Sequence, residues 1–409
     1  MNNNQPGDRY LRSLGLRPAQ DSDALAAQLR QAVGDAQAEA ALDALYRRQQ
    51  QQASGTLDRQ ETATFYDLKN QHPQASLILS AAHDWDLLCQ TCQWVTEHPD
   101  AFGATILDVG CDCGLLSCFL AQTFPHSRIT SIDRSANGIH AAQQLAERLG
   151  LTNITFLHAD LETLPPMEFD TVFSSRTVQE NYDPLLENAR FLPLTHQGRI
   201  CAQVFQRYTS LLCQFVKPGG TFVTVERMER DRVFLGYCLA LHSQGLDLVP
   251  ESHQELHCQE GDHTTALQAF YGVKEGRTTA TDAEDFFIAT FQDALTWQPR
   301  HLDVEGELIL ELCAQELIRG HFLHNPQGAR VGKLAIYTSK FDPEELFYYQ
   351  GILGQPVQVH RLSRGELTEV MALLEADLAT LTASTLSAHP FSFQNGVELL
   401  LPLEEPEET

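Results

Sequence analysis

The sequence predicts an α/β protein built on a doubly wound, mostly parallel sheet. Between residues 105 and 225, short apolar segments alternate with helix-like segments. The first apolar segment ends in a turn of small residues, Gly110 to Gly114, and the second ends in an acidic residue, Asp133. Strands and helices that alternate at this length are typical of a parallel sheet covered by helices on both faces.

The predicted strands are short and apolar, and a helix or a turn separates each from the next. They cover residues 106–109, 129–132, 154–157, 171–174 and 221–225. Helical segments follow the first strand, as LLSCFLAQTF, and the second, as residues 136–149. This order gives one βαβ unit around the turn and extends it into a larger sheet.

The turn and Asp133 together predict a site for a nucleotide-like ligand. Glycines at a strand-to-helix turn let a ligand approach the backbone, and the start of the helix points unpaired N–H groups at it. An acidic residue about 20 positions further on, at the tip of the next strand, can accept hydrogen bonds from ribose hydroxyls. Asp133 has this position.

The glycine spacing distinguishes between ligand classes. A nicotinamide or flavin fingerprint, G-x-G-x-x-G, needs glycine at 110, 112 and 115, and only Gly110 matches. A nicotinamide-dependent oxidoreductase is therefore the third-ranked alternative. The pattern (D/E)-x-G-x-G-x-G fits better, because Asp108, Gly110 and Gly114 match it and only Asp112 departs.

Five segments between residues 105 and 226 resemble class I S-adenosylmethionine-dependent methyltransferases. ILDVGCDCGLLSCFLA is similar to motif I of that family, ITSIDRS to motif II and FLHADLETLP to the segment after the third strand. FDTVFSSRTVQEN resembles the fourth strand and its exit, and KPGGTFVTVE resembles the fifth strand with its preceding turn. A single glycine turn would be weak evidence, whereas five matches in order are strong.

The resemblance implies a seven-stranded sheet and a division of the chain. LDLVPESHQELHC and TTALQAFYGV would be the last two strands, an antiparallel pair, and the domain would end near Lys274. We therefore expect an N-terminal helical segment over residues 1–60, the methyltransferase domain over 61–275 and a small C-terminal α+β accessory domain over 276–409.

The resemblance also implies S-adenosylmethionine as the cofactor and assigns residues to it. Asp133 would hold the ribose hydroxyls, Asp160 would accept from the adenine amino group, and Leu161 would contact the ring. A cap or turn role is the alternative for both aspartates, and their places at consecutive strand tips favour binding. The remaining contacts would be Asp108, Gly110, Cys111, Asp112 and Gly114 on the methionine and ribose side, with Ser174 and Ser175 near the sulfonium.

Asp112 is the departure from the family pattern. A carboxylate there adds bulk and negative charge beside a ligand whose sulfonium and ammonium are positive. Either Asp112 turns outward or pairs with the ligand's ammonium, or cofactor binding has been lost. Retained binding is favoured, because the other motif positions are intact.

The methyl acceptor is expected outside the carboxyl ends of the fourth and fifth strands. Methyl transfer needs alignment and water exclusion, and a general base only if the acceptor must lose a proton, so no fixed catalytic set is expected. Candidates for acceptor contact are Glu180, Asn181 and Tyr182 in one loop and Arg227, with Arg230 and Arg232, in the other. The arginines could bind a carboxylate or phosphate, or they could pair with neighbouring acids in a solvated loop.

Outside the sheet, helices are expected at both ends of the chain. Residues 21–52 and 61–98 have helical periodicity, and in the second segment Tyr66 and His83 are candidate contacts, although core or surface roles are favoured. After a linker at 276–281, we expect helices at 282–297, 305–319 and 366–382, strands at 333–338 and 356–361, and an acidic tail.

Charge and composition limit the partners. Lys and Arg number 28 against 54 Asp and Glu, a net charge of −26, which would repel nucleic acid and anionic membranes. No apolar run approaches the roughly 18 residues that span a bilayer, so we expect a cytoplasmic protein. Two groups of side chains have the residue types of a metal site: Cys89, Cys92, Cys111 and Cys113, and separately His253, His257, Cys258 and His263. Neither group is favoured as a metal cluster, and no metal is expected.

These observations favour an enzyme, a class I methyltransferase that acts on a small-molecule acceptor, which could be anionic, or on a protein acceptor. We expect neither nucleic acid nor a membrane among the partners, and the sequence leaves open whether the protein forms a homodimer. The alternative is a noncatalytic, methyltransferase-like binding or scaffold protein that has kept the sheet. The departure from the glycine pattern at Asp112 would then indicate that cofactor binding has been lost.

Overall fold

The computed structural model describes most of the chain. The described residues are 5–19, 21–54, 59–178, 181, 194–260, 263–274, 283–290, 310, 313–340, 342–353, 358–383, 385–394 and 397–400. The chain forms two compact units: one contains Met1–Leu185, Ala202–Glu229 and Tyr237–Phe286, and the other Leu186–Cys201, Arg230–Gly236 and Phe287–Thr409. The expected boundaries at residues 60 and 275 stay a prediction.

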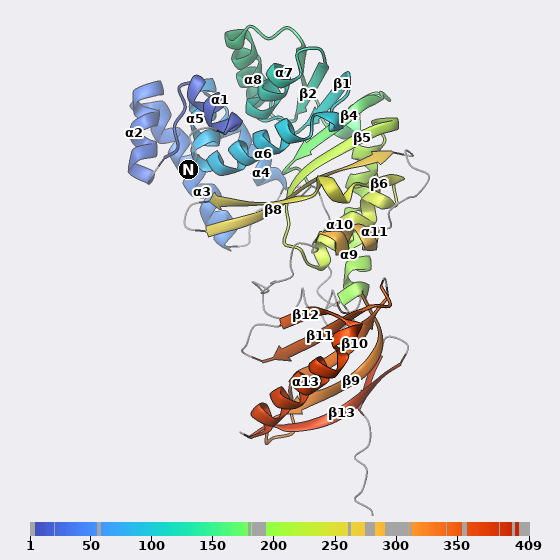
Figure 1. The fold of residues 1–409 in the computed structure, drawn as a ribbon. Helices are drawn as coiled ribbons and strands as arrows, with labels where there is room; N and C mark the ends of the chain where they lie inside the picture. Colours follow the sequence, from blue (N-terminus) through green and yellow to red (C-terminus); the bar gives the residue numbers. More distant parts are fainter. Residues whose placement is uncertain are drawn as a thin grey trace, which may run out of the picture. The chain divides into compact units, whose positions relative to one another are not determined.

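The first unit is built on a mixed, mostly parallel sheet (Figure 1), which confirms the predicted α/β class. The strand order is β3-β2-β1-β4-β5-β8-β6, and β7 also pairs with β8. Strands β1 to β5 run parallel, and β8 is antiparallel to β5. The strands are β1 Thr105–Val109, β2 Arg128–Asp133, β3 Ile154–His158, β4 Phe169–Ser175, β5 Val216–Arg227, β6 Leu246–Leu248, β7 Gln254–Glu260 and β8 His263–Lys274.

The predicted number of strands was wrong by one. The segment expected as a single strand after Gly245 forms two, β6 and β7, so the sheet has eight strands. A short 3-10 turn at Pro250–Ser252 separates them. Proline at the start of that turn has no N–H to give to a ladder, which explains the interruption.

Helices connect and cover the parallel strands. The described ones are α7 Leu115–Thr123, α8 Ala136–Leu149, α9 Leu194–Cys213 and α10 Arg232–His242. The Ser135 hydroxyl caps α8 by accepting from Gly138 N at 3.1 Å. The predicted helix 136–149 has the bounds of α8, and Gly150 ends it in the left-handed conformation, φ +67°.

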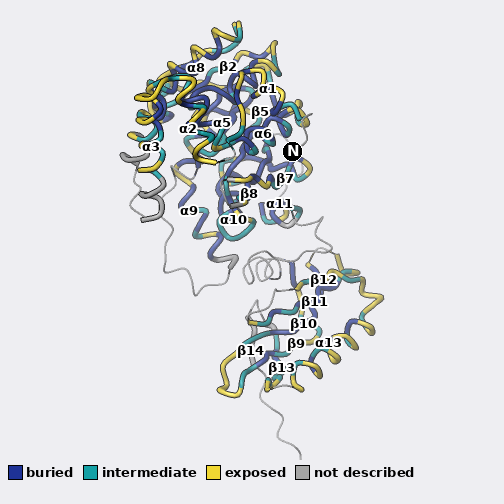
Figure 2. Tube along the Cα trace, turned by 90° about the vertical axis from the view of Figure 1, so that its left-hand side faces the viewer, coloured by how far each residue is buried: buried dark blue, intermediate teal, exposed yellow. Residues whose placement is uncertain are grey.

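In the described part of the chain six α-helices precede the sheet, and all of them except α4 contribute residues to its hydrophobic core. They are α1 Pro6–Ser13, α2 Ser22–Val33, α3 Asp35–Ser54, α4 Arg59–Lys69, α5 Pro73–His83 and α6 Trp85–Glu97. Tyr10, Trp94 and Ile106 belong to one buried cluster, and the Tyr10 hydroxyl donates to Leu115 O at 2.8 Å. Figure 2 shows the buried residues of α1 and α6 beside those of the sheet.

The single helix predicted over residues 21–52 is two helices. Gly34, at φ +82°, ends α2, and α3 starts at the next residue. Glycine takes this backbone conformation without a steric cost, so it stops a helix that the surrounding periodicity would continue. The region 61–98 is helical as predicted, with breaks before Pro73 and at Asp84.

The second unit contains a six-stranded antiparallel sheet in the order β12-β11-β10-β9-β13-β14. Helix α13, Leu367–Thr382, packs Val370, Leu374 and Leu378 against Leu323 and Ile336 of the sheet. The strands are β9 Ala314–His324, β10 Arg330–Ser339, β11 Glu345–Ile352, β12 Gln358–Ser363, β13 Ser387–Gln394 and β14 Val397–Leu400.

The helix predicted at 305–319 was wrong over residues 314–319, which belong to β9, whereas the described residues 310 and 313 are helical. Strand β9 pairs with β10 on one side and β13 on the other. At Gly320 a Cβ atom would lie 2.5 Å from the Phe391 ring. Tertiary pairing therefore overrides the local helical pattern.

Other predictions in the C-terminal part were closer. The strand at 333–338 and the helix at 366–382 are confirmed, β12 overlaps the strand expected at 356–361, and α11, Ala283–Ala289, overlaps the helix expected at 282–297. Strands β11, β13 and β14 were missed. The linker 276–281 and the acidic tail lie outside the described residues. Among the helices that the structure describes, none is both long enough and apolar enough to cross a bilayer.

Candidate functional site

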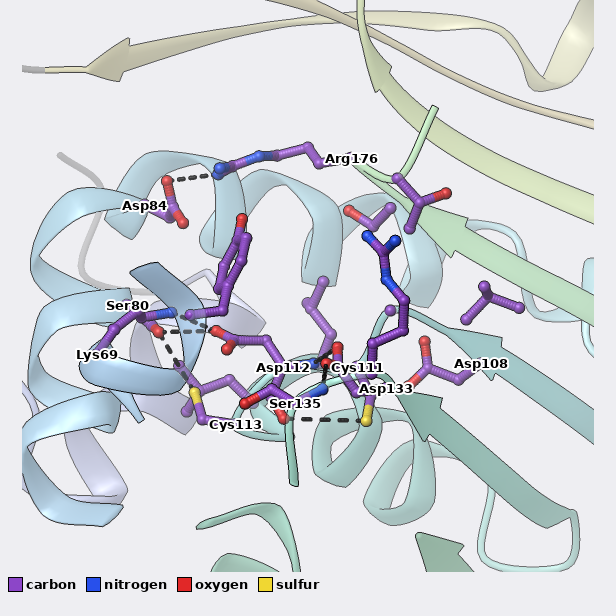
Figure 3. A pocket seen from close by; sticks show the side chains of 18 of the residues that line it. Lys69, Ser80, Asp84, Asp108, Cys111, Asp112, Cys113, Asp133, Ser135 and Arg176 are labelled. Carbon is purple, nitrogen blue, oxygen red and sulfur yellow. Dashed lines mark hydrogen bonds and ion pairs between the residues drawn. The ribbon is translucent and has the colours of Figure 1, made fainter. Parts of the chain in front are cut away.

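A cavity of about 480 Å³ lies in the first unit at the carboxyl ends of the parallel strands. The turn after β1, the tip of β2, the segment after β3 and the exits of β4 and β5 line one part of it. Residues of α3, α4, α5 and α6 line the rest. Figure 3 shows the polar side chains that gather there. The volume lies within the range of small-molecule sites.

Glycine is required at two positions of the turn after β1. Gly110 has φ +75°, and a Cβ there would lie 2.6 Å from Thr177 Cγ2. Gly114 has φ +79°, and its Cβ would lie 2.6 Å from the Cβ of Ala142 in α8. The turn is therefore packed against β4's exit on one side and α8 on the other, with its backbone open to the cavity.

Asp133, at the tip of β2, lines the cavity and holds the two adjoining turns. Its Oδ2 accepts from Asp112 N at 2.8 Å, and its Oδ1 accepts from Ser135 N at 2.7 Å. Burial, together with the charge of Asp112, raises the pKa of Asp133 to about 6. A carboxylate has further lone pairs, so hydroxyl donors on a ligand can still bind it.

Asp108, in β1, is almost fully buried at the floor of the cavity. The hydroxyls of Ser117 and Ser131 donate to its Oδ2 at 2.5 Å and 3.0 Å. Burial raises the pKa of Asp108 to about 6, although the two serines oppose this. The group is thus fixed in place by its own chain.

Asp112 lines the cavity, and its carboxylate is bound by residues at the end of α4 and in α5. It forms an ion pair with Lys69 and accepts from the Ser80 hydroxyl at 3.1 Å (Figure 3), and it also accepts from Asn70 Nδ2 at 2.8 Å. Burial alone would raise the pKa of Asp112, but Lys69 and these donors lower it. The Asp112 carboxylate is thus paired within the chain at the edge of the cavity, and retained cofactor binding stays a prediction.

The segment after β3 places two predicted residues at the cavity. Leu161 is buried in the lining, and Asp160 lies beside it. Asp160 Oδ1 also accepts from Glu162 N at 2.9 Å and caps a short 3-10 helix. Asp160 therefore caps the short helix and also lies at the cavity.

A buried carboxyl group, that of Glu226, binds the backbone that follows β4. Glu226, at the end of β5, accepts from Thr177 N at 3.1 Å, Val178 N at 3.3 Å and the Ser174 hydroxyl at 3.2 Å. Burial raises the pKa of Glu226 to about 8. Between these anchored residues, Arg176 takes φ +57°, a conformation that costs energy for a non-glycine residue.

The structure brings most of the predicted site residues together. The cavity is lined by Asp108, Gly110, Cys111, Asp112, Asp133, Asp160, Leu161, Ser175, Asn181 and Arg227. Gly114 lies outside the lining and packs on α8, and Ser174 is buried with Glu226. Glu180 and Tyr182 lie outside the described residues.

Of the three arginines expected near the acceptor, Arg227 is the last residue of β5 and lines the cavity. Arg230 Nη1 donates to Thr290 O at 2.7 Å, and Arg232 starts α10. Only Arg227 stays a candidate for acceptor contact.

Several residues at the cavity were missed or given little weight from the sequence. Lys69, Ser80, Asp84 and Arg176 line it, and so do Tyr66 and His83, for which core or surface roles were favoured. The available signal was the polar pair Lys69-Asn70, which lies inside the segment 61–98 predicted to be helical and at the end of α4 in the structure. Among the described residues, no group of three or more His, Cys, Asp or Glu side chains could hold a metal ion.

Residues 101–265 match a family model described as a methyltransferase domain. Over 107 residues the chain is 36% identical to ribosomal RNA small subunit methyltransferase G of Chlorobium luteolum, which covers 26% of this chain and 43% of that protein. Over 118 residues it is 29% identical to malonyl (acyl-carrier protein) O-methyltransferase of Paenibacillus sp., covering 29% of this chain and 37% of that protein. The chain thus spans less than half the length of these curated relatives.

Solved structures give a weaker likeness. A SAM-dependent methyltransferase from Aquifex aeolicus is 18% identical, with a TM-score of 0.35, over 49% of this chain and 98% of that one. Magnesium protoporphyrin IX methyltransferase from Synechocystis with bound SAM is 17% identical, with a TM-score of 0.33, over 51% of this chain and 83% of that one.

Proposed function

We propose that this chain, whose residues 101–265 form a class I methyltransferase domain, transfers a methyl group from S-adenosylmethionine to an acceptor. The observation that carries the proposal is the cavity at the strand ends, which brings Gly110, Asp133 and Asp160 together in one lining. Ligands of doubly wound sheets bind in this place.

The residues present fit the proposed cofactor. The turn at Gly110 has a backbone that no Cβ covers, Asp133 can accept from ribose hydroxyls, and Leu161 offers an apolar surface beside Asp160. The carboxylates of Asp108 and Asp133 match the positive charge of the sulfonium and ammonium. When bound, the cofactor would supply an already activated methyl group.

The role of the protein's own residues is then to align and to exclude water. Ser175, Asn181, Tyr208 and Arg227 line the side of the cavity where β4 and β5 end, which is where an acceptor would lie. Just after Ser175, the backbone N–H groups of Thr177 and Val178 donate to Glu226, which fixes the position of the backbone on the acceptor side. Alignment of this kind can supply a large part of the rate enhancement.

The acceptor is proposed to be a small molecule, with a protein as the second choice. The net charge of −26 disfavours a nucleic acid, although curated relatives named for ribosomal RNA keep that acceptor class in the test. Arg227 at the cavity supports an anionic group on the acceptor. The alternative, a noncatalytic scaffold, rests on Asp112. Its carboxylate is paired with Lys69, Asn70 and Ser80, which supports a cavity that can still accept a positively charged ligand.

Calorimetric titration with S-adenosylmethionine tests the proposal. We expect binding in the micromolar range, and we expect S-adenosylhomocysteine to bind while NADH does not. No detectable heat at millimolar ligand would reject the enzyme. Labelled methyl donor, supplied with fractions of small metabolites, purified protein or ribosomal RNA, then identifies the acceptor class, and Arg227→Gln should raise the Michaelis constant only for an anionic acceptor.

A further inference from the structure

A hydrogen-bond network joins the end of α4 to the turn after β1. Lys69 forms an ion pair with Asp112, and Asn70 Nδ2 donates to Asp112 Oδ1 at 2.8 Å. Lys69 and Asn70 are 8% and 1% exposed, whereas the Asp112 side chain is 27% exposed, so both contacts are partly shielded from water. Asp112 stands where the family pattern has glycine, and its partners are supplied by a helix outside the sheet.

The same end of α4 also holds the turn after β2. The Ser135 hydroxyl donates to Asp67 Oδ1 at 3.1 Å, and Asn137 Nδ2 donates to Asp67 O at 3.1 Å. Helix α4 therefore bonds to the two turns that flank the proposed cofactor position.

Asp133 connects these two turns to each other. It accepts from Asp112 N and from Ser135 N, and these two residues are the ones that α4 contacts through their side chains. Any ligand that binds Asp133 therefore meets a carboxylate whose position depends on α4. Helix α4 in turn places Phe65 and Tyr66 in the lining of the cavity.

The arrangement costs energy at one residue, which argues for a use. Asp112 has φ +46°, where glycine would be unstrained, and it forms a partly buried ion pair whose desolvation offsets part of its attraction. Each feature costs free energy, so neither stabilises the fold efficiently. Both specify the position of α4 relative to the turn.

We propose that Asp112 is a positioning residue that fixes α4 over the cavity, so that α4 docking and S-adenosylmethionine binding strengthen each other. The inference rests on the proposed function, because it takes S-adenosylmethionine as the ligand of the turns. Coupling of this kind is reciprocal: if docked α4 improves ligand affinity, then the ligand must stabilise docked α4 by the same factor.

The test measures both sides of this coupling in the full chain. Hydrogen exchange of residues 64–83 is followed with and without saturating S-adenosylmethionine, and the dissociation constant is measured by calorimetry. In the wild type we expect the ligand to slow exchange in this segment. Asp112→Gly should raise the dissociation constant about tenfold and remove most of that ligand-dependent slowing.

A double variant separates positioning from plain stability. Asp112→Gly leaves the Lys69 ammonium buried without its carboxylate, which lowers the melting temperature. Asp112→Gly with Lys69→Met removes that charge and should recover the melting temperature, while the dissociation constant stays raised. Recovery of both quantities together would show a merely structural role and overturn the inference.

Asp170→Asn is the matched control, since Asp170 pairs with Lys217 at the opposite end of β4 and does not line the cavity. It should leave the dissociation constant and the protection of residues 64–83 unchanged. If Asp112→Gly binds S-adenosylmethionine as the wild type does, or more tightly, the inference is wrong while the proposed function stands. If the wild type binds none, the proposed function fails first.

Discussion

Arg176 Nη1 lies 2.5 Å from Asp84 Oδ1, which ties the loop after β4 to the junction of α5 and α6 at the cavity (Figure 3). The two side chains are 26% and 19% exposed, so the pair is only partly screened by water. His83 Nδ1 also bonds to Asp84 at 2.8 Å. The pair therefore contributes to holding the N-terminal helices on the sheet.

Asp84→Asn is expected to lower the free energy of unfolding by about 1–3 kcal/mol at pH 7. Burial would raise the pKa of Asp84, but Arg176 and His83 hold it well below its usual range. The stabilisation is thus fully present above the unfolded pKa of 3.8 and is lost progressively as the pH falls from there toward the lower pKa of the folded state. Urea unfolding at pH 7, 5 and 3.5 should show the same gap between the two proteins at pH 7 and 5 and a narrower one at pH 3.5.

Glu147→Gln, at an exposed position of α8, is the control and should change little. An Asp84→Asn protein as stable as the wild type at pH 7 would show that the pair contributes nothing measurable.

Gly110→Ala is expected to damage the turn more than its backbone angle alone explains. Gly110 and Gly219 have φ of +75° and +73°, so alanine costs about 1–2 kcal/mol of strain at either. At Gly110 the new Cβ would also lie 2.6 Å from Thr177 Cγ2, whereas nothing lies within 4 Å at Gly219. Gly110→Ala should therefore lose more stability and bind S-adenosylmethionine more weakly, and Gly219→Ala should bind it normally.

Thr177→Ser removes the methyl group that the new Cβ would meet and keeps the hydroxyl that bonds to Ser174 at 2.6 Å. Adding Thr177→Ser to Gly110→Ala should restore part of the lost affinity. Equal losses in the two alanine variants, with no rescue, would assign the whole effect to backbone strain.

The βαβ core could be predicted from the sequence because its signals are local. Alternating apolar segments placed β1 to β5, and the glycine turn and Asp133 placed the cavity. The orientation of Asp112 could not be predicted, since its partners Lys69 and Asn70 lie more than forty positions away and belong to a different element. The helical pattern predicted over residues 314–319 misses β9, because β9 is held between β10 and the distant strand β13 by pairing that this pattern does not reveal.

Glu226→Gln is expected to change how stability depends on pH. Burial raises the pKa of Glu226 from 4.5 to about 8, so the folded state retains this proton more strongly than the unfolded state does. Its contribution to stability is present in full below pH 4.5 and is lost as the pH rises through 8. Glutamine does not ionise, so the stability of the variant should fall less between pH 5 and pH 8.5, as urea unfolding at several pH values would show.

The test compares how steeply the free energy of unfolding changes with pH in the wild type and in Glu226→Gln. Its absolute value is not used, because glutamine also alters the bonds to Thr177 and Val178 and lowers stability at every pH. Parallel curves for the two proteins would show that Glu226 is ionised in the folded state across this range.

Asp133→Ala is expected to weaken S-adenosylmethionine binding by about 1–3 kcal/mol, since a ligand hydroxyl would lose a charged acceptor. Because burial and Asp112 raise the pKa of Asp133 to about 6, the wild-type carboxylate is mostly protonated at pH 5 and ionised at pH 7.5. Affinity should therefore rise over this interval in the wild type and rise less in Asp133→Ala, in which Asp108, whose pKa burial also raises to about 6, still ionises. Calorimetry at both pH values measures this difference, with Glu147→Gln expected to follow the wild type. If Asp133→Ala shows the wild-type affinity and the wild-type pH dependence, the ribose of the cofactor does not bind at the tip of β2.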